Sequence, residues 1–127
     1  MKAGQLRTVL LNVSDLEPSR RFYGELLGMR VQFAPEDDHV VVFDAGTTSL
    51  VLHGHGEYAE AGAPGPDQAG AVLLFFAVDD VDAAVAELRA AGVTVTQEPV
   101  DQSWGERDAA VLDPDGYSIH LTRSLEP

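Results

Sequence analysis

An internal repeat constrains the fold of this 127-residue chain more than any other feature of its sequence. The segment VSDLEPSRRFYGELLGMRV (residues 13–31) matches VDDVDAAVAELRAAGVTV (78–95), and TSLVL (48–52) matches YSIHL (117–121). Each copy is too short to bury both faces of a sheet by itself, so the two copies are expected to complete one shared core. The chain is therefore predicted to be built from two equivalent modules.

Each module is predicted to contain one strand, one helix and three further strands. Apolar and polar residues alternate up to Val13, and the period then becomes helical from an N-cap at Asp15 to a C-terminal stop at Gly28. The second copy repeats this pattern between Asp80 and Gly92. Strands are expected at about 6–13, 29–34, 39–44 and 49–53 in the first module, and at about 72–78, 93–97, 107–112 and 117–122 in the second.

These elements describe a single α+β domain over residues 1–127, made of tandem βαβββ modules at about 5–55 and 71–123. Between the modules, residues 54–70 hold five glycines and two prolines without any periodicity, which predicts a loop. Phe33 and Phe43 lie on predicted strands of the first module, and we expect both rings to belong to the core.

The charge balance argues against several classes of partner. With 21 acidic and 8 basic residues the formal charge is −13, which repels phosphate backbones and anionic lipids. The chain has no cysteine, so disulfides and thiolate chemistry are excluded. Its first stretch, MKAGQLRTVLLNVSDLEP, has the pattern of neither a signal peptide nor a membrane span. We expect a cytoplasmic protein that binds neither nucleic acid nor membrane.

Three stretches, VSDLEPSRRFYGELLGM, VDDVDAAVAELRAAGV and DPDGYSIHL, resemble the vicinal-oxygen-chelate superfamily of glyoxalase I, extradiol dioxygenases, fosfomycin-resistance proteins and bleomycin-resistance proteins. The resemblance covers nearly the whole chain. It implies that the tandem modules form a curled, U-shaped mixed sheet, with the helices on its outer face and a ligand in the trough. Because the superfamily contains several kinds of enzyme and also pure binding proteins, the fold does not choose the activity.

Enzymes of that superfamily hold a divalent ion with side chains on the first and last strands of each module. The resemblance places these positions at Thr8, Val51, Leu73 and His120 in this chain. Only His120 is a good ligand, whereas such ions normally need about three protein ligands. Val51 and Leu73 would remove water from an ion without replacing it. The sequence therefore predicts no metal and no cofactor.

Two further histidines leave an alternative open. His53 and His55 are two residues apart, so on a strand they would share a face with Val51, and His53 could approach His120. The stretch HGHGE also has the composition of a loop, where histidines are usually solvated. The two interpretations are a relocated metal site and ordinary pocket or surface histidines.

The C-terminal third most resembles the bleomycin-resistance proteins. They share a Trp-Gly pair, an arginine-containing strand, an Asp-Pro-x-Gly turn and a strand with a histidine, which correspond here to Trp104, Arg107, 113–116 and His120. Those relatives are acidic dimers that bind a cationic, aromatic glycopeptide without changing it. The resemblance therefore implies a homodimer with an aromatic small-molecule ligand.

Further candidate contacts with such a ligand are aromatic or charged. Phe75 shares a strand face with Leu73, giving an apolar floor. Trp104 is either a stacking platform or a side chain packed under a loop or in a dimer interface, and Tyr58 is a loop aromatic that could cover a ligand. Arg107 either orients the ligand or pairs with a neighbouring acid. The remaining carboxylates could lie at the mouth of the pocket and favour a basic group on the ligand, although each by itself is interpreted as a solvated surface charge: Glu57, Asp101, Glu106 and Asp108.

The sequence thus favours a metal-independent binding protein that sequesters an aromatic natural product or antibiotic, as in self-resistance. In this interpretation Thr8, Arg107 and His120 supply orienting hydrogen bonds, and apolar residues supply contact area. One alternative is a metal-dependent enzyme of the glyoxalase, dioxygenase or transferase type. Another is a cofactor-free isomerase with His120 as its base.

Overall fold

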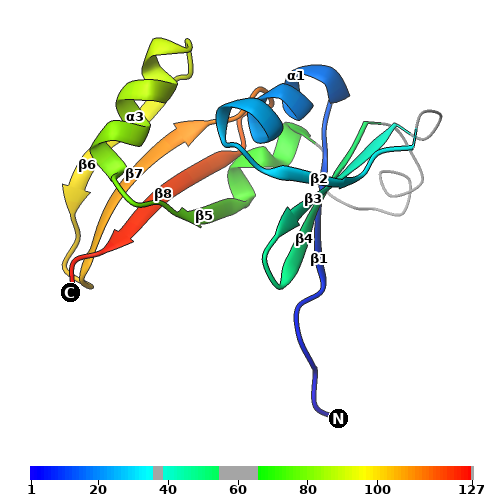
Figure 1. Ribbon diagram of the computed structural model, residues 1–127, viewed down its shortest axis with the longest axis horizontal. Helices are drawn as coiled ribbons and strands as arrows, with labels where there is room; N and C mark the ends of the chain where they lie inside the picture. Colours follow the sequence, from blue (N-terminus) through cyan, green and yellow to red (C-terminus); the bar gives the residue numbers. More distant parts are fainter. Residues whose placement is uncertain (36–38, 55–65, 127) are drawn as a thin grey trace. The chain divides into compact units, whose positions relative to one another are not determined.

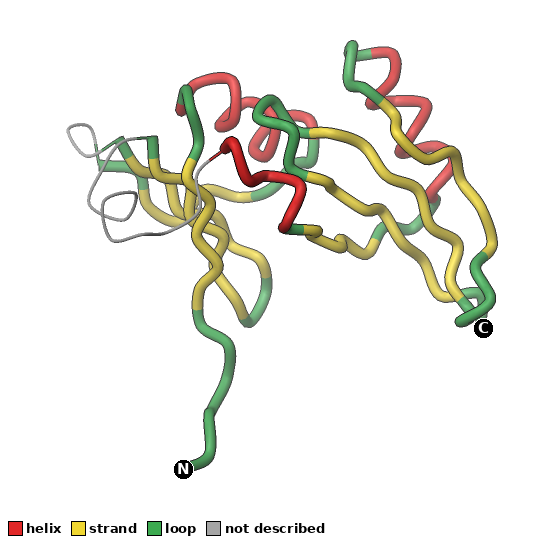
Figure 2. Tube along the Cα trace, turned by 180° about the vertical axis from the view of Figure 1, so that it is seen from behind, coloured by secondary structure: helices red, strands yellow, loops and turns green. Residues whose placement is uncertain are grey.

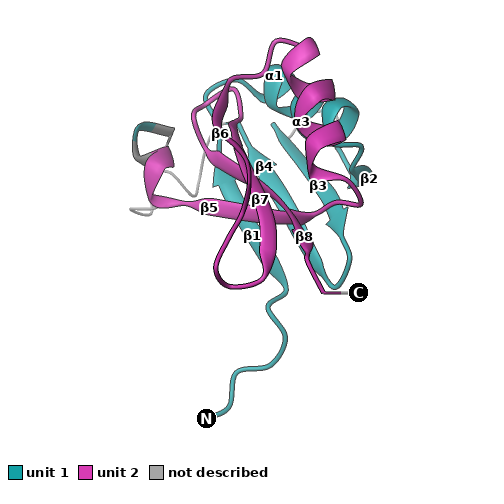
Figure 3. Ribbon diagram, turned by 90° about the vertical axis from the view of Figure 1, so that its left-hand side faces the viewer, with its two compact units in different colours: residues 1–67 teal, residues 68–127 magenta. Residues whose placement is uncertain are grey.

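The computed structural model describes residues 1–35, 39–54 and 66–126 (Figure 1). The chain divides into two compact units, Met1–Asp67 and Gln68–Pro127, coloured separately in Figure 3. Each unit contains one copy of the sequence repeat. Together they give an α+β fold with one four-stranded mixed sheet in each unit.

The first unit consists of a sheet with one helical layer. Its strands lie in the order β1-β4-β3-β2, with β1 parallel to β4 and the other neighbours antiparallel. The elements along the chain are β1 (Thr8–Asn12), α1 (Leu16–Arg21), the π-helical segment η1 (Phe22–Leu26), β2 (Arg30–Phe33), β3 (Val40–Ala45) and β4 (Thr48–His53).

The second unit repeats this topology. Its strand order is β5-β8-β7-β6, with β5 parallel to β8, and α3 packs on β6, β7 and β8. A short 3-10 helix, η2, comes directly before β5 along the chain (Figure 2). The elements are η2 (Pro66–Ala71), β5 (Leu73–Ala77), α3 (Val81–Ala90), β6 (Val95–Asp101), β7 (Glu106–Leu112) and β8 (Ser118–Ser124).

The predicted helix starts are confirmed by the caps. The Asp15 carboxylate accepts a hydrogen bond from the Glu17 N–H at 3.3 Å, and the Asp80 carboxylate accepts one from the Ala83 N–H at 3.0 Å. Gly28 has φ +71° at the other end of the first helical segment, a left-handed conformation in which glycine avoids a Cβ clash. The sequence period thus located both helices correctly, although it did not distinguish η1 from α1.

Both units build their cores between the helix and one face of the sheet. In the first unit Tyr23 and Phe43 are fully buried, and their ring centroids are 6.3 Å apart. In the second, Val85 of α3 and Ile119 of β8 are fully buried. The prediction that Phe33 is a core residue is wrong, because β2 is the edge strand and this ring is 62% exposed.

The strand registers confirm that the modules are equivalent position by position. Val51 lies between Leu10 and Val42, and His120 lies between Phe75 and Ala110. Because side chains alternate between the faces of a strand, Val51 and His120 both project from the face opposite the helix. We call this the open face of each sheet. Thr8 and Leu73 occupy its other pair of equivalent positions, opposite Ser49 and Ser118.

The predicted loop at 54–70 is observed only in part. Its last residues belong to η2, where Ala69 is buried, which the glycine-rich composition did not suggest. Residues 55–65 lie outside the described residues. Among the residues that are described, no helix is long and apolar enough to cross a membrane.

Candidate functional site

The hairpin between β7 and β8 positions the histidine that the sequence singled out. At its turn, Oδ1 of Asp113 accepts hydrogen bonds from the N–H groups of Asp115 at 2.8 Å and Tyr117 at 2.9 Å. Gly116 has φ +90°, which this tight reversal requires. The turn therefore sets the register that places His120 opposite Ala110 on the open face of the second sheet.

His120 is held by a buried carboxylate from the neighbouring strand. Its Nδ1 lies 2.8 Å from Oδ1 of Asp108, and the two side chains are 12% and 4% exposed. Asp108 pairs with Thr122, and Ala110 pairs with His120. Asp108 therefore lies two residues from Ala110 on the same face of β7, diagonally opposite His120. The expectation that Asp108 is a solvated surface charge is wrong, because this register turns its carboxylate toward the imidazole.

Two glutamines complete the shell around that carboxylate. Nε2 of Gln97, on β6, donates to Oδ2 of Asp108 at 2.9 Å and also to the Asp108 backbone carbonyl at 3.2 Å. Nε2 of Gln102 donates to the same Oδ2 at 3.4 Å. Three side chains thus converge on one buried acceptor, which fixes the carboxylate and, through it, the imidazole.

An apolar surface lies beside the imidazole. Phe75 pairs with His120 across β5 and β8, and the two rings are stacked, with centroids 4.3 Å apart and planes 25° apart. Phe75 and its strand neighbour Leu73 remain 57% and 50% exposed on the open face. The structure therefore brings together three of the predicted ligand contacts, and the apolar ones are available to a ligand.

Trp104 is an exposed aromatic side chain of the second unit. It lies in the turn between β6 and β7 and is 63% exposed. The same turn carries Gln102, whose backbone N–H bonds to the Glu106 carbonyl at 2.7 Å and whose side chain reaches Asp108. The turn that presents the indole is thus tied to the carboxylate behind His120.

Arg107 lies on the other face of β7. Its guanidinium makes two bonds to the Asp82 carboxylate on α3, at 2.6 and 2.9 Å, and one to Asp101 at 2.9 Å. These bonds raise the pKa of Arg107 and lower the pKa of Asp82 below its ordinary value. Of the two roles left open by the sequence, the structure has the arginine paired with neighbouring acids, on the face that α3 covers.

The remaining predicted contacts belong to the first unit. Thr8, Val51 and His53 lie on the open face of its sheet, with Val51 buried and His53 partly buried. Tyr58 and His55 lie outside the described residues, so their predicted roles stay predictions.

The four inherited strand positions do not fit a divalent metal ion. Their side chains are one hydroxyl, two aliphatic groups and one imidazole, contributed by Thr8, Val51, Leu73 and His120. About three nitrogen or oxygen ligands are normally needed. Among the described residues, no group of three histidines, cysteines or carboxylates is arranged to hold an ion.

Sequence reasoning missed Gln97 and Gln102, and it named Asp108 near the pocket without recognising it as the partner of His120. A signal for Asp108 was nevertheless present. In a hairpin, residues at equal distances from the turn pair with each other, so the Asp113–Gly116 turn places Asp108 diagonally opposite His120. No comparable signal existed for the glutamines. Register shifts in the pairing of β6 with β7 decide which side chain of β6 faces the carboxylate.

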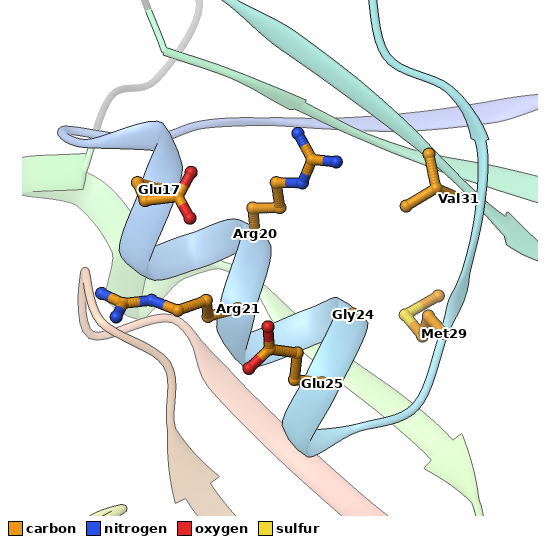
Figure 4. A pocket seen from close by; sticks show the side chains of 7 residues that line it. All are labelled: Glu17, Arg20, Arg21, Gly24, Glu25, Met29 and Val31. Atoms are coloured by element: carbon orange, nitrogen blue, oxygen red, sulfur yellow. The ribbon is translucent and has the colours of Figure 1, made fainter.

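A hollow of about 230 Å³ lies elsewhere, beside α1 and η1 of the first unit (Figure 4). It is lined by residues of α1 and η1 and by two side chains of the segment that leads into and along β2: Glu17, Arg20, Arg21, Gly24 and Glu25, with Met29 and Val31. The hollow contains none of the predicted site residues, and it is set apart from the open face of the first sheet. We do not assign the ligand to it.

Comparison with known proteins gives a consistent match. Residues 5–121 match the model of the Glyoxalase/Bleomycin resistance protein/Dioxygenase superfamily. Among solved structures, TnmS3, an antibiotic binding protein from Streptomyces sp. CB03234, has 30% sequence identity and a TM-score of 0.76, with 98% of each chain covered. A glyoxalase/bleomycin resistance protein from the same organism has 30% identity and a TM-score of 0.69, covering 94% of this chain and 100% of that one.

The similar proteins also include an enzyme. A lactoylglutathione lyase from Haemophilus influenzae is 32% identical over 129 residues, which cover 92% of this chain and 90% of the lyase. Binding proteins and enzymes are thus found at similar identity, so the choice between them depends on the residues of the site.

Proposed function

Because the chain belongs to the Glyoxalase/Bleomycin resistance protein/Dioxygenase superfamily, we propose that it is a small-molecule binding protein that sequesters an aromatic natural product without a metal ion. The observation that carries this proposal is the open face of the second sheet. There, exposed Leu73 and Phe75 flank one imidazole that is already fixed by Asp108. Apolar contact area beside a few oriented polar groups is typical of sites for small aromatic ligands.

The net charge contributes to the choice of ligand. A charge of −13 attracts cations over distances comparable to the Debye length, so an aromatic ligand with a basic group would associate faster. Raising the salt concentration should therefore slow association more than it hastens dissociation, because stacking at short range is not screened.

The proposal is tested by titrating the protein with planar two- and three-ring aromatic compounds while following Trp104 fluorescence and heat release. We expect saturable binding of micromolar or better affinity, with the compounds recovered unchanged by mass spectrometry. Trp104→Ala should weaken binding by on the order of 1–3 kcal/mol if the exposed indole stacks on the ligand. Failure of the whole panel to bind would refute the proposal.

Metal content provides a separate check. We expect the purified protein to hold no stoichiometric Mn, Fe, Ni or Zn and to keep its melting temperature in EDTA, because the inherited positions offer one good ligand, His120. One tightly bound ion per chain, with a lower melting temperature after chelation, would support the metal-dependent alternative instead.

One observation favours a second candidate, a cofactor-free isomerase. A histidine whose Nδ1 is held by a buried carboxylate is also the arrangement of a general base, as in the pairing of His120 with Asp108. Incubation that converts a bound compound into a product, and that loses the conversion in His120→Gln, would favour this enzyme over the binding protein.

We also propose that the protein is a homodimer. All four residues of the edge strand β2 are exposed, including the apolar Val31 and Phe33. Unpaired apolar edges are usually covered in the cell, and pairing with a second copy would do so. Sedimentation at micromolar concentration should give a species of twice 13.6 kDa, and a single species of 13.6 kDa would contradict the proposal.

A further inference from the structure

We propose that the ligand donates a hydrogen bond to Nε2 of His120 and that it is a planar aromatic compound carrying a phenolic hydroxyl. This inference rests on the proposed binding function and narrows its ligand. It follows from the direction of the hydrogen bonds that lead from Gln97 and Gln102 through Asp108 to His120.

The chain of bonds begins at the glutamines. Gln97 donates through Nε2 to both the backbone carbonyl and Oδ2 of Asp108, so its amide has one orientation. Gln102 donates to the same oxygen. Two amide donors on Oδ2 suit the carboxylate form of Asp108, which can only accept hydrogen bonds. The remaining contact, from His120 Nδ1 to Oδ1, is therefore an N–H donating to a carboxylate.

The tautomer of the imidazole follows. A neutral imidazole has one donor nitrogen and one acceptor nitrogen, so a proton at Nδ1 leaves a lone pair at Nε2. Within the described residues no side chain or backbone group donates a hydrogen bond to Nε2 of His120. Stacking with Phe75 also fixes the plane of the imidazole, so the lone pair has one direction.

The chemistry of the ligand is the complement of this lone pair. A hydroxyl or N–H on the ligand would satisfy it, whereas an ether or carbonyl oxygen would set one lone pair against another. The exposed surfaces of Phe75 and Leu73 lie beside the imidazole and favour a flat apolar ring. A hydroxyl attached directly to an aromatic ring meets both requirements within one rigid group.

The tautomer is measured without any ligand. Two-bond proton–nitrogen NMR correlations at about pH 8, where a histidine is ordinarily neutral, distinguish the two tautomers, and His120→Gln identifies the signal. We expect the proton on Nδ1. A proton on Nε2, or on both nitrogens, would overturn the inference whatever compounds the protein binds.

The ligand preference is measured with a matched pair of probes, β-naphthol and its methyl ether, by calorimetry. We expect β-naphthol to bind about tenfold more tightly, the effect of one neutral hydrogen bond. Equal binding of the pair would overturn this inference while leaving the proposed binding function intact. Binding of neither probe, nor of any other planar compound, would refute both.

Asp108→Asn provides the variant that reverses the preference. The Nε2 group of Gln97, fixed by the backbone carbonyl of residue 108, requires an oxygen facing it, so the new amide must turn its NH₂ group toward His120. His120 Nδ1 would then accept, and Nε2 would carry the proton. We expect the NMR tautomer to switch and the methyl ether to bind at least as tightly as β-naphthol. A folded variant that still prefers β-naphthol to its methyl ether would contradict the inference. If the variant does not fold, the NMR measurement of the His120 tautomer in the wild-type protein remains the test.

Discussion

The two units share a topology and a core, but their open faces differ. On β4 and β8 the helix-facing residues are similar, since Leu52 and Leu121 are both buried leucines and the buried Leu50 corresponds to the buried Ile119. On the open face, Val51 of the first unit corresponds to His120 of the second, and Val40 corresponds to Asp108. The histidine and its carboxylate are thus replaced together by two valines.

This difference shows which constraints the repeat preserves. Packing between helix and sheet needs apolar side chains that fill the space in each unit, so polar substitutions there are costly. The open face does not pack on the helix, and an Asp–His pair on it needs both partners, because either alone would be a poorly satisfied polar group. The first unit therefore keeps an apolar open face at these positions, and the second unit carries the polar chemistry.

The largest effect is expected where the units are most alike. Leu52→Ala and Leu121→Ala should each lower the free energy of unfolding by about 2–5 kcal/mol, the usual result of removing a buried leucine side chain. Chemical denaturation of both variants measures this. Leucine-to-alanine changes at different buried sites vary by about 2 kcal/mol. A larger difference between the two variants would contradict the equivalence of the two cores.

A smaller effect is expected from the carboxylate and its counterpart. Asp108→Ala should cost about 1–3 kcal/mol, because the donors of Gln97, Gln102 and His120 lose their common acceptor. Val40→Ala is the matched control in the first unit, and it removes only partly buried methyl groups. Urea denaturation measures the free energy of unfolding of both variants. A smaller loss for Asp108→Ala than for Val40→Ala would contradict the proposed difference between the two open faces.

Making the second open face resemble the first sharpens the comparison. His120→Val should lower the free energy of unfolding by about 1–2 kcal/mol, because Oδ1 of the buried Asp108 carboxylate loses its donor while Oδ2 keeps both glutamines. The same variant should lose the preference for β-naphthol over its methyl ether. A variant that retained this preference would show that the hydroxyl is recognised elsewhere.

The smallest effect concerns the exposed ion pairs. In the first unit Asp44 has a lowered pKa because of a hydrogen bond from the Gly46 N–H and then because of Arg30, whereas in the second the bond from Arg107 is the main reason for the lowered pKa of Asp82. A lowered pKa stabilises the folded state above the ordinary value of 3.8, and this contribution is lost as the pH falls through the lowered pKa.

Arg107→Gln should therefore reduce the dependence of stability on pH in this acid range more than Arg30→Gln does. Both changes should be small, since exposed pairs contribute little. Thermal melts from neutral pH down to about pH 3 compare the two variants in the window where ordinary aspartates titrate. An equal response, or a larger one from Arg30→Gln, would contradict the assignment of the main cause.

The sequence alone determined the repeat, the order of the elements and the equivalence of Val51 and His120. These depend on local signals, namely caps at Asp15 and Asp80, a change of hydrophobic period, and turn residues such as Gly116. Such signals involve neighbours in the chain, so they can be recognised without knowing what lies across the sheet.

The tertiary structure decided what surrounds His120. Asp108 was interpreted from the sequence as a solvated charge and Phe33 as a core ring, and both predictions were wrong. Burial depends on which strand is an edge and which residues are paired across strands, and β6 changes its register twice against β7. The hydrogen bonds from Gln97 and Gln102 follow from that register, which arises only when strands distant in the sequence pair with one another.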